Sequence, residues 1–519
     1  MAVEKSMEPS DILLAEDDMV PDLAVVVEDP ESIEVVMDDG SVVVEFGDSS
    51  EMDEEVSHDS NLAEYIDDAE LESISSDLVD HFMSDRESRG EWASAYIKGM
   101  DLLGMKVEER TEPWNGASGV YHPMMTEAVI KFQAQAMGEL LPASGPVRTK
   151  IMGKLTPEKF EQSQRVETEL NYLITEKMPD YRDEMEQMLF KLPMAGSAFK
   201  KIYFDPLSER PVSQFVPAED LVVSYGASNL RTAPRFTHVM KKTPEEILKL
   251  QVNGFYRDVE LPTATKDITD IEEKYNELEG SEPTFSDDPR HTILEMHVDL
   301  DLPEPFDDVD GVALPYVVTI DKSSGIILSI RRNWYEDDSK REKRMHVVHY
   351  PYLPGMGFYG TGLIHTLGGL TKSATSIMRQ LIDAGTLSNL PAGFKARGMR
   401  ITGDNTPIMP GEFRDVDVPA GTIKESIVPL PYKEPSSVLY SLLGNVVDEG
   451  RRIGAVGDIQ VGDINAQAPV GTTLALMERS MQVMSGIQAR LHAAMKQELR
   501  ILARLVHAYM PAEYAYAMD

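Results

Sequence analysis

A glycine-rich stretch at residues 354–362, PGMGFYGTG, is the first place where the sequence could do chemistry. Its G-x-G-x-x-G spacing follows an apolar run and precedes a helical pattern, as in a dinucleotide-binding turn. That turn also needs an acid about 20 residues onward, at the end of the next strand. Here that position falls near Asp383, inside the helical pattern, while Pro351 and Pro354 interrupt the preceding strand. The sequence therefore favours a flexible turn that begins a long helix over a nucleotide site.

Carboxylates and histidines between residues 290 and 350 are the second candidate for chemistry. Asp299 and Asp301 share one face of a predicted strand, and we interpret them as solvated strand carboxylates. We interpret the nearby histidines as hydrogen-bonded structural residues; they are His291, His297, His346 and His349. The sequence contains no H-E-x-x-H, no G-x-S-x-G and no phosphate loop that ends in G-K-[ST]. We expect no catalytic residue, metal or cofactor, and a hydrolase that uses these carboxylates and histidines stays a less favoured alternative.

Composition limits the class of protein further. The chain has 519 residues, which is too long for one core, so several modules are expected. It has no cysteine, which excludes disulfides, thiolate nucleophiles and zinc sites that need sulfur, and suits a reducing compartment. No signal peptide and no run of about 18 uncharged apolar residues is visible, so nothing points to secretion or to a membrane.

The negative charge is concentrated at the N-terminus. The formal net charge is −40, and residues 1–70 hold 24 Asp and Glu against the single basic residue Lys5. Short valine patches such as AVVV and SVVVEF lie among these acids. The pattern predicts that residues 1–60 are an acidic, largely disordered or partner-docking arm.

The elements that must position any site begin after this arm. Apolar residues recur at helical spacing over 61–111, which predicts one or two amphipathic helices, and again over 124–142. Two further helices should begin at a threonine followed by proline, at Thr156 and at Thr243, where Glu246 completes a capping box. Residues 197–205 and 234–243 look like strands.

Residues 290–350 are the part of the sequence that looks most like strands. Turn signals separate four apolar runs, which predicts an antiparallel meander; the runs cover residues 291–302, 314–320, 326–336 and 344–352. The polar residues 271–289 before them predict a flexible surface loop. The expected fold class is therefore mixed α+β.

From Leu363 the apolar residues recur at alternating steps of four and three, which is the pattern of a helix-packing seam. The seam residues are Leu363, Leu367, Leu370, Ala374, Ile377, Leu381 and Ala384. On the other faces lie small or polar residues, which we expect to allow close packing of neighbouring helices and a polar channel surface; they are Gly368, Gly369, Thr371, Ser373, Thr375 and Ser376.

A Pro- and Gly-dense region with short β-like runs follows, and then a second helix after Pro435. A loop rich in Gly and amides leads to the longest helical pattern of the chain, which runs to Pro511 with Gly486 as a possible kink. Methionines at helical spacing on this helix predict adaptable packing rather than cofactor contacts; they are Met477, Met481, Met484 and Met495.

This order of elements resembles the portal protein, or head-to-tail connector, of tailed double-stranded DNA bacteriophages, of the podovirus type. The resemblance is carried by three stretches: residues 351–398, residues 454–507, and residues 114–142, which look like an early wing helix. It implies a portal-type fold whose parts are a wing at 61–355, a first stem helix at 356–392, a clip at 393–434, a second stem helix at 435–455, a tunnel loop at 456–471, a kinked helix at 472–510 and a remnant of the crown at 511–519.

The resemblance also implies function and partners. A portal is a structural protein without catalysis of its own, and about twelve copies form a ring at one capsid vertex of the virion, assembled in the host cytoplasm. Double-stranded DNA passes through the ring without sequence preference during packaging and ejection. The implied partners are the terminase large subunit, a neck or adaptor protein, and the major capsid and scaffolding proteins. A different virion scaffold or neck protein stays open as an alternative.

The sequence nominates residues for the DNA path. Few basic residues, repeated around a ring, would give weak and sequence-blind phosphate contacts that let DNA slide. The candidates are Lys372, Arg379, Lys395, Arg397, Arg400, Arg451 and Arg452. In the tunnel loop, glycines would supply mobility and amides neutral hydrogen bonds; the candidates there are Gly457, Asp458, Gln460, Gly462, Asp463, Asn465, Gln467 and Gly471.

Overall fold

A computed structural model describes most of the chain. The described residues are 57–389, apart from gaps at 107, 152, 206–207, 265–266, 282–288, 304–305 and 307–310, then 432–454 and 470–510, with side chains of the last helix from 485 on. Six strands of the remaining sequence are described by their backbone: β1 (Ser32–Val36), β2 (Val42–Phe46), β11 (Gly393–Lys395), β12 (Arg400–Ile401), β13 (Val416–Asp417) and β14 (Ile427–Pro429).

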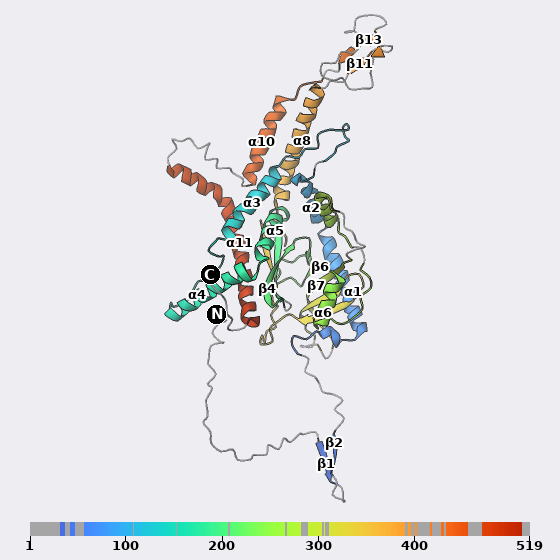
Figure 1. The fold of residues 1–519 in the computed structure, drawn as a ribbon, viewed down its shortest axis with the longest axis vertical. Helices are drawn as coiled ribbons and strands as arrows, with labels where there is room; N and C mark the ends of the chain where they lie inside the picture. The colour runs from blue at the N-terminus through green and yellow to red at the C-terminus, as the bar shows by residue number, and fades with distance from the viewer. Residues whose placement is uncertain are drawn as a thin grey trace.

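Two antiparallel sheets form the body of the molecule (Figure 1). The larger sheet has the order β5-β6-β7-β8-β9, with β5 at Leu221–Val223, β6 at Arg235–Lys242, β7 at His291–Leu300, β8 at Leu314–Asp321 and β9 at Ile327–Arg332. The smaller sheet has the order β10-β3-β4, with β10 at Val347–Pro351, β3 at Ser197–Asp205 and β4 at Arg210–Pro217.

Helices cover both sheets. They are α1 (Asp68–Ser88), α2 (Gly90–Met100), α3 (Met124–Leu140), α4 (Pro157–Tyr172) with a π-helical turn at Leu173–Lys177, α5 (Tyr181–Ala195), α6 (Pro244–Val252) and α7 (Asp270–Glu279), with 3-10 turns at Leu62–Glu64 and Asp101–Leu103. Leu71, Leu78 and Phe82 of α1 pack on the larger sheet. The main core joins α2, α3 and α5 to the smaller sheet.

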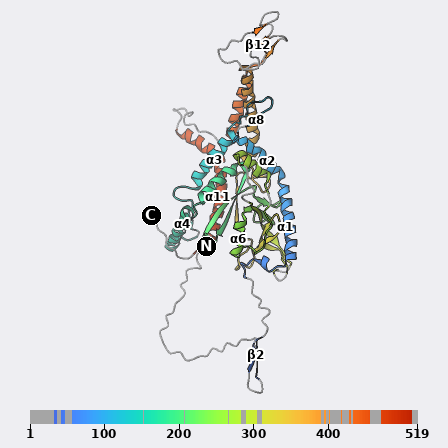
Figure 2. The same cartoon turned by 45° about the vertical axis from the view of Figure 1, so that its right-hand side comes forward.

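Three long helices extend the body. Helices α8 (Leu363–Asn389) and α10 (Ser437–Ile453) lie side by side and project from it, and strands β11 to β14 lie at their far end (Figures 1 and 2). These four strands form two antiparallel pairs, β11–β14 and β12–β13. Helix α11 (Val470–Tyr509) changes direction along its length, and its C-terminal part packs on β10 and β3 (Figure 1).

Much of the sequence-based expectation is confirmed. The fold is mixed α+β with antiparallel sheets. Residues 61–111 form two helices, and α3 ends at Leu140, before Pro142. The side chain of Thr156 caps α4, and Thr243 with Glu246 forms the complete capping box of α6.

Other expectations are wrong. Strand β10 does not continue the meander but pairs with β3, Val347 opposite Lys201, because long-range packing, not proximity in sequence, decides the pairing. Residues 270–279 form helix α7 rather than a loop, with a capping box of Thr269 and Glu272. The polar composition of that segment, in which only Ile271 is buried, hid the helix. The sequence analysis also did not predict α5, β4 or β5.

The helix boundaries differ slightly from the expected parts. Helix α8 begins at Leu363, not at residue 356, because residues 354–362 form the preceding turn. Helix α11 begins at Val470, so Gly471 belongs to its first turn rather than to a loop. Within the acidic segment, β1 and β2 pair in antiparallel register, and β2 consists of Val42–Phe46 from the valine patch. No helix in the described ranges is long and apolar enough to span a bilayer.

Candidate functional site: the α8–α10 pair and the groove beside it

The glycine-rich turn before α8 packs closely against the backbone at the end of α5. A Cβ atom on Gly360 would lie 2.2 Å from the carbonyl oxygen of Gly196, and one on Gly362 would lie 2.2 Å from that of Met194. Gly196 itself ends α5 with a φ of +83°, a value that favours glycine. The backbone N–H of Gly360 donates to Ser197 Oγ at 2.7 Å. The glycines therefore let two backbones meet, which fixes the start of α8, and the turn is tightly packed rather than flexible.

The four candidate histidines are hydrogen-bonded structural residues, as expected. One ring nitrogen of each lies 3.0–3.2 Å from a side-chain oxygen: the pairs are His291 with Asp321, His297 with Glu295, His346 with Asn333, and His349 with Ser197. Asp299 and Asp301 are exposed at the end of β7. Among the described residues, no group of three or more His, Asp or Glu side chains could hold a metal ion.

Helix α8 divides along its length between burial and exposure. The first seam residues, Leu363, Leu367 and Ala374, are buried in the body, whereas Leu370, Ile377 and Leu381 are half-buried. Gly368, Thr371 and Thr375 are also buried within the chain, so the expectation that they face a channel is wrong. Thr371 and Thr375 satisfy their hydroxyls inside the chain, through the Leu367 carbonyl and the His122 N–H.

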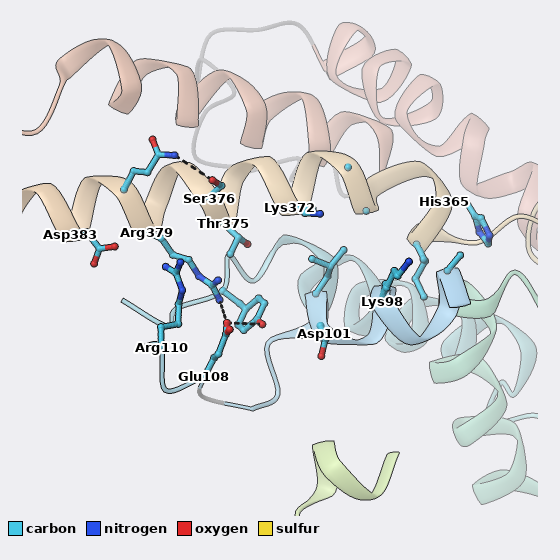
Figure 3. A pocket seen from close by; sticks show the side chains of 18 of the residues that line it. Lys98, Asp101, Glu108, Arg110, His365, Lys372, Thr375, Ser376, Arg379 and Asp383 are labelled. Carbon is cyan, nitrogen blue, oxygen red and sulfur yellow. Dashed lines mark hydrogen bonds and ion pairs between the residues drawn. The ribbon is translucent and has the colours of Figure 1, made fainter. Parts of the chain in front are cut away.

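Exposed small and polar residues form one outward face of α8. They recur at helical spacing, and they are His365, Gly369, Lys372, Ser373, Ser376 and Gln380. This face borders a groove of about 770 Å³ that α8 shares with α2 and with the segment from Glu108 to Tyr121 (Figure 3). The groove carries charges of both signs, including Lys98, Asp101, Glu108, Lys372 and Asp383.

Arg379 ties α8 to this segment (Figure 3). Its guanidinium lies 2.6 Å from Glu108 Oε2, donates to the carbonyls of Val120 and Gly119, and covers the Tyr121 ring at 4.5 Å. Burial alone would raise the pKa of Glu108, but hydrogen bonds from Arg379 and Tyr121 lower it overall. The arrangement keeps the Glu108 carboxylate charged and holds the segment against α8.

The other predicted basic residues occupy different environments. Lys372 is exposed on the groove wall, Arg451 lies 3.5 Å from Glu127, and Arg452 lies 3.1 Å from Glu449. Lys395 and Arg400 belong to β11 and β12, whose side chains are outside the description. Arg397 and the loop candidates Gly457, Asp458, Gln460, Gly462, Asp463, Asn465 and Gln467 lie outside the described residues.

A feature of α10 was missed in the sequence. Val438, Tyr440 and Leu442 expose 73%, 72% and 44% of their surface, and Ile453 and, on α8, Ile382 are also exposed. The signal was present in the four-residue step between Val438 and Leu442, which places two apolar residues on one face. Because α10 packs on α8 with another face, the face of Val438 and Leu442 has no cover among the described residues, and Tyr440 is exposed on a different side of the helix.

Comparison with known proteins identifies the family. No curated protein matches the chain. A family model described as "Phage SU10 portal protein" matches residues 145–510, a range that contains both sheets, α8, α10 and α11. Since this match covers well over half of the sequence, the chain belongs to the SU10 portal protein family and functions as a phage portal protein.

Proposed function

We propose that about twelve copies of the chain form a closed ring, in which the α8–α10 pairs surround an axial channel for double-stranded DNA. The observation that carries the proposal is the uncovered apolar face of α10 that Val438 and Leu442 share, one helical turn apart. Burying a Val or Leu side chain is worth about 1.5–3 kcal/mol, so a neighbouring copy that covers this surface would gain stability. The portal family implies ring assembly in general.

The exposed face of α8 supplies a matching surface. Gly369, Ser373 and Ser376 are small and exposed, and Gly369 and Ser376 line the groove. Small side chains let a second helix approach closely, so α10 of the next copy would pack here and place its apolar residues against α8. Such a contact is heterologous, and a heterologous contact closes into a ring when its rotation divides a full turn.

The parts of the portal follow from this arrangement. The body up to residue 355 forms the wing, α8 and α10 the stem, and residues 393–434 the clip, where β11 to β14 lie (Figure 1). We assign residues 456–469, between α10 and α11, to the tunnel loop, α11 to the kinked helix and residues 511–519 to the remnant of the crown; both of these residue ranges lie outside the described residues.

For the DNA path we assign Lys372, Arg451 and Arg452 on the stem, with Lys395, Arg397 and Arg400 in the clip. Arg452 has a side chain that is 76% exposed, and its pair with Glu449 three residues away is a weak surface pair. Arg379 differs, because four contacts occupy its guanidinium, and this favours a role in positioning the segment beside α8 over DNA contact.

The partners follow from where each part lies. The clip stands farthest from the body, which suits docking of the terminase large subunit and, after packaging, of a neck protein (Figure 2). The wing would contact the major capsid and scaffolding proteins at the vertex. Energy for packaging would come from the terminase, and the portal itself would carry out no catalysis.

The test is to purify the full chain and to measure its assembly by mass photometry and its shape by electron microscopy. We expect a discrete particle near twelve protomers, with an axial opening in averages viewed down the symmetry axis. A particle that stays monomeric or dimeric at micromolar concentration, or an open lattice without an axis, would refute the ring.

A further inference from the structure

Helix α6 carries an apolar stripe that faces solvent. Leu248 and Val252 lie one turn apart on α6, and Phe255 follows three residues later, after the helix has ended; they expose 57%, 78% and 40% of their surface. The inner side of α6 packs on the larger sheet, because Ile247 is buried in a cluster with Ile293 and Leu328 of that sheet. The described part of the chain therefore leaves Leu248 and Val252 largely uncovered, while Arg331 and Tyr256 contact the Phe255 ring and cover part of it.

The acidic arm joins the body beside this stripe. The side chain of Arg331 donates to the carbonyl of Asp59 and also to those of Gly254 and Phe255, the last two at 3.3 and 3.0 Å. Its guanidinium also lies 4.6 Å from the centre of the Phe255 ring. The Arg331 side chain thus links Asp59, where the acidic arm meets the body, to Phe255 at the end of the stripe.

The acidic arm contains an isolated two-stranded sheet, the β1–β2 hairpin. Strands β1 and β2 pair in antiparallel register, and seven of their ten residues are Ile, Val or Phe. An isolated two-stranded hairpin is only marginally stable in water, so such a hairpin needs an apolar surface to pack on. Figures 1 and 2 draw the hairpin apart from the body, beyond the end where α6 lies.

The connection is long enough for the hairpin to return. Eleven peptide steps separate Phe46 from Ser57, which reach at most about 36–40 Å. Ser57 itself is held by Arg332, next to Arg331 in sequence. A tether of this length keeps the hairpin at an effective concentration in the millimolar range near the stripe, so even a weak contact would be populated.

We propose that the β1–β2 hairpin docks on the stripe of Leu248, Val252 and Phe255 in its own chain. The hairpin carries four acids, Glu34, Asp38, Asp39 and Glu45, while α6 presents both Lys249 and Glu245 beside the stripe. Since the surface carries both signs, apolar burial supplies most of the contact, and its dependence on salt is small. The proposal is independent of ring formation, because every contact lies within one chain.

The absence of cysteine makes a direct test possible in the full chain. Met37→Cys between the two strands and Asn253→Cys beside the stripe receive spin labels, and dipolar spectroscopy measures the distance between them. A short, narrow distance distribution is expected, and it should persist when labelled chain is diluted tenfold into unlabelled chain before assembly. A broad distribution would overturn the proposal, and so would a short distance that disappears on dilution, because it would place the hairpin on another copy.

Variants separate docking from mere proximity. The double substitution Leu248→Asp with Val252→Asp alters only exposed side chains, and it should convert the narrow distribution into a broad one. Leu155→Asp, at another exposed leucine, is the matched control and should leave the distribution unchanged. Circular dichroism confirms that each variant is folded. An unchanged narrow distribution in the double variant would rule out the stripe as the docking surface.

Discussion

At the scale of the residue, buried histidines in the two sheets make the body of the molecule sensitive to acid. Burial is the main cause that lowers the pKa of His238 and of His346 to about 3 and that of His349 to about 4, against an ordinary value of 6.5. Below pH 6.5 the unfolded chain therefore takes up protons that the folded chain does not. The free energy of unfolding falls as the pH drops from 6.5 towards these values.

Acids whose pKa is raised by burial act in the opposite direction, and among those of the described residues Asp220 has the large shift; the others are Glu169, Glu184 and Asp299. Burial, with a contribution from Glu219, raises the pKa of Asp220 to about 7 from 3.8, so its contribution to stability rises as the pH falls from 7 to about 4. The stability lost through the three histidines on acidification is larger than the stability gained through Asp220. We therefore expect a net loss of stability on acidification.

This predicts that urea unfolding of the chain at pH 5 needs less free energy than at pH 7.5, with about 2 kcal/mol lost per buried histidine. His346→Gln, which cannot take up a proton, should reduce the difference between the two pH values by about that amount. His81→Gln, at an exposed histidine of α1, is the control and should not reduce it. An equal effect of both substitutions would contradict the explanation.

At the scale of the element, one buried ion pair holds α11 on the smaller sheet. Glu498 of α11 and Lys200 of β3 are fully buried, with 3.5 Å between Lys200 Nζ and Glu498 Oε1. The same carboxylate accepts hydrogen bonds from Ser213 of β4 at 2.6 Å and from Tyr350 of β10. All three strands of the sheet therefore meet the helix at one side chain.

Breaking this pair should loosen α11. Glu498→Gln leaves the Lys200 charge without its counter-ion in the core, so we expect it to cost about 3–5 kcal/mol of unfolding free energy. Hydrogen exchange should show loss of protection along the C-terminal part of α11. Lys200→Met should be similarly harmful, and combining it with Glu498→Gln should recover part of the loss.

Lys496→Met is the matched control, because Lys496 lies on the same helix but is exposed. It should change the unfolding free energy by less than about 0.5 kcal/mol. If Lys200→Met proved equally mild, the pair would not be what holds α11 to the sheet.

At the scale of the whole molecule, assembly should depend on the apolar surface of α10. A charge at the centre of a helix contact must be desolvated, so Leu442→Asp is expected to reduce the ring population at least tenfold in mass photometry while the single chain stays folded. Tyr225→Asp, at an exposed tyrosine of the body, is the control and should leave the rings intact. Rings that survive Leu442→Asp would show that α10 is not an intersubunit surface.

The prediction from sequence succeeded where the signal is local. The caps at Thr156 and Thr243, the end of α3 and the start of the heptad at Leu363 all depend on residues within one or two turns of a helix. The order of helices and strands also sufficed for the resemblance to portal proteins, which the family match confirms.

Contacts between distant parts of the chain could not be read from the sequence. The pairing of β10 with β3 and the burial of Thr371 and Thr375 depend on which surfaces meet after folding. The same holds for the ion pair of Arg379 with Glu108, because nothing in the sequence around Arg379 indicates that Glu108 is its partner.

The amino-acid sequence by itself thus determined most of the helices, the caps at Thr156 and Thr243, and the family, because helix periodicity and capping act over a few residues. Only the tertiary structure decided which side chains are covered and which, such as those on α6 and α10, stay exposed among the described residues. Burial is a property of two surfaces that come together, and one of them is usually far away in the chain.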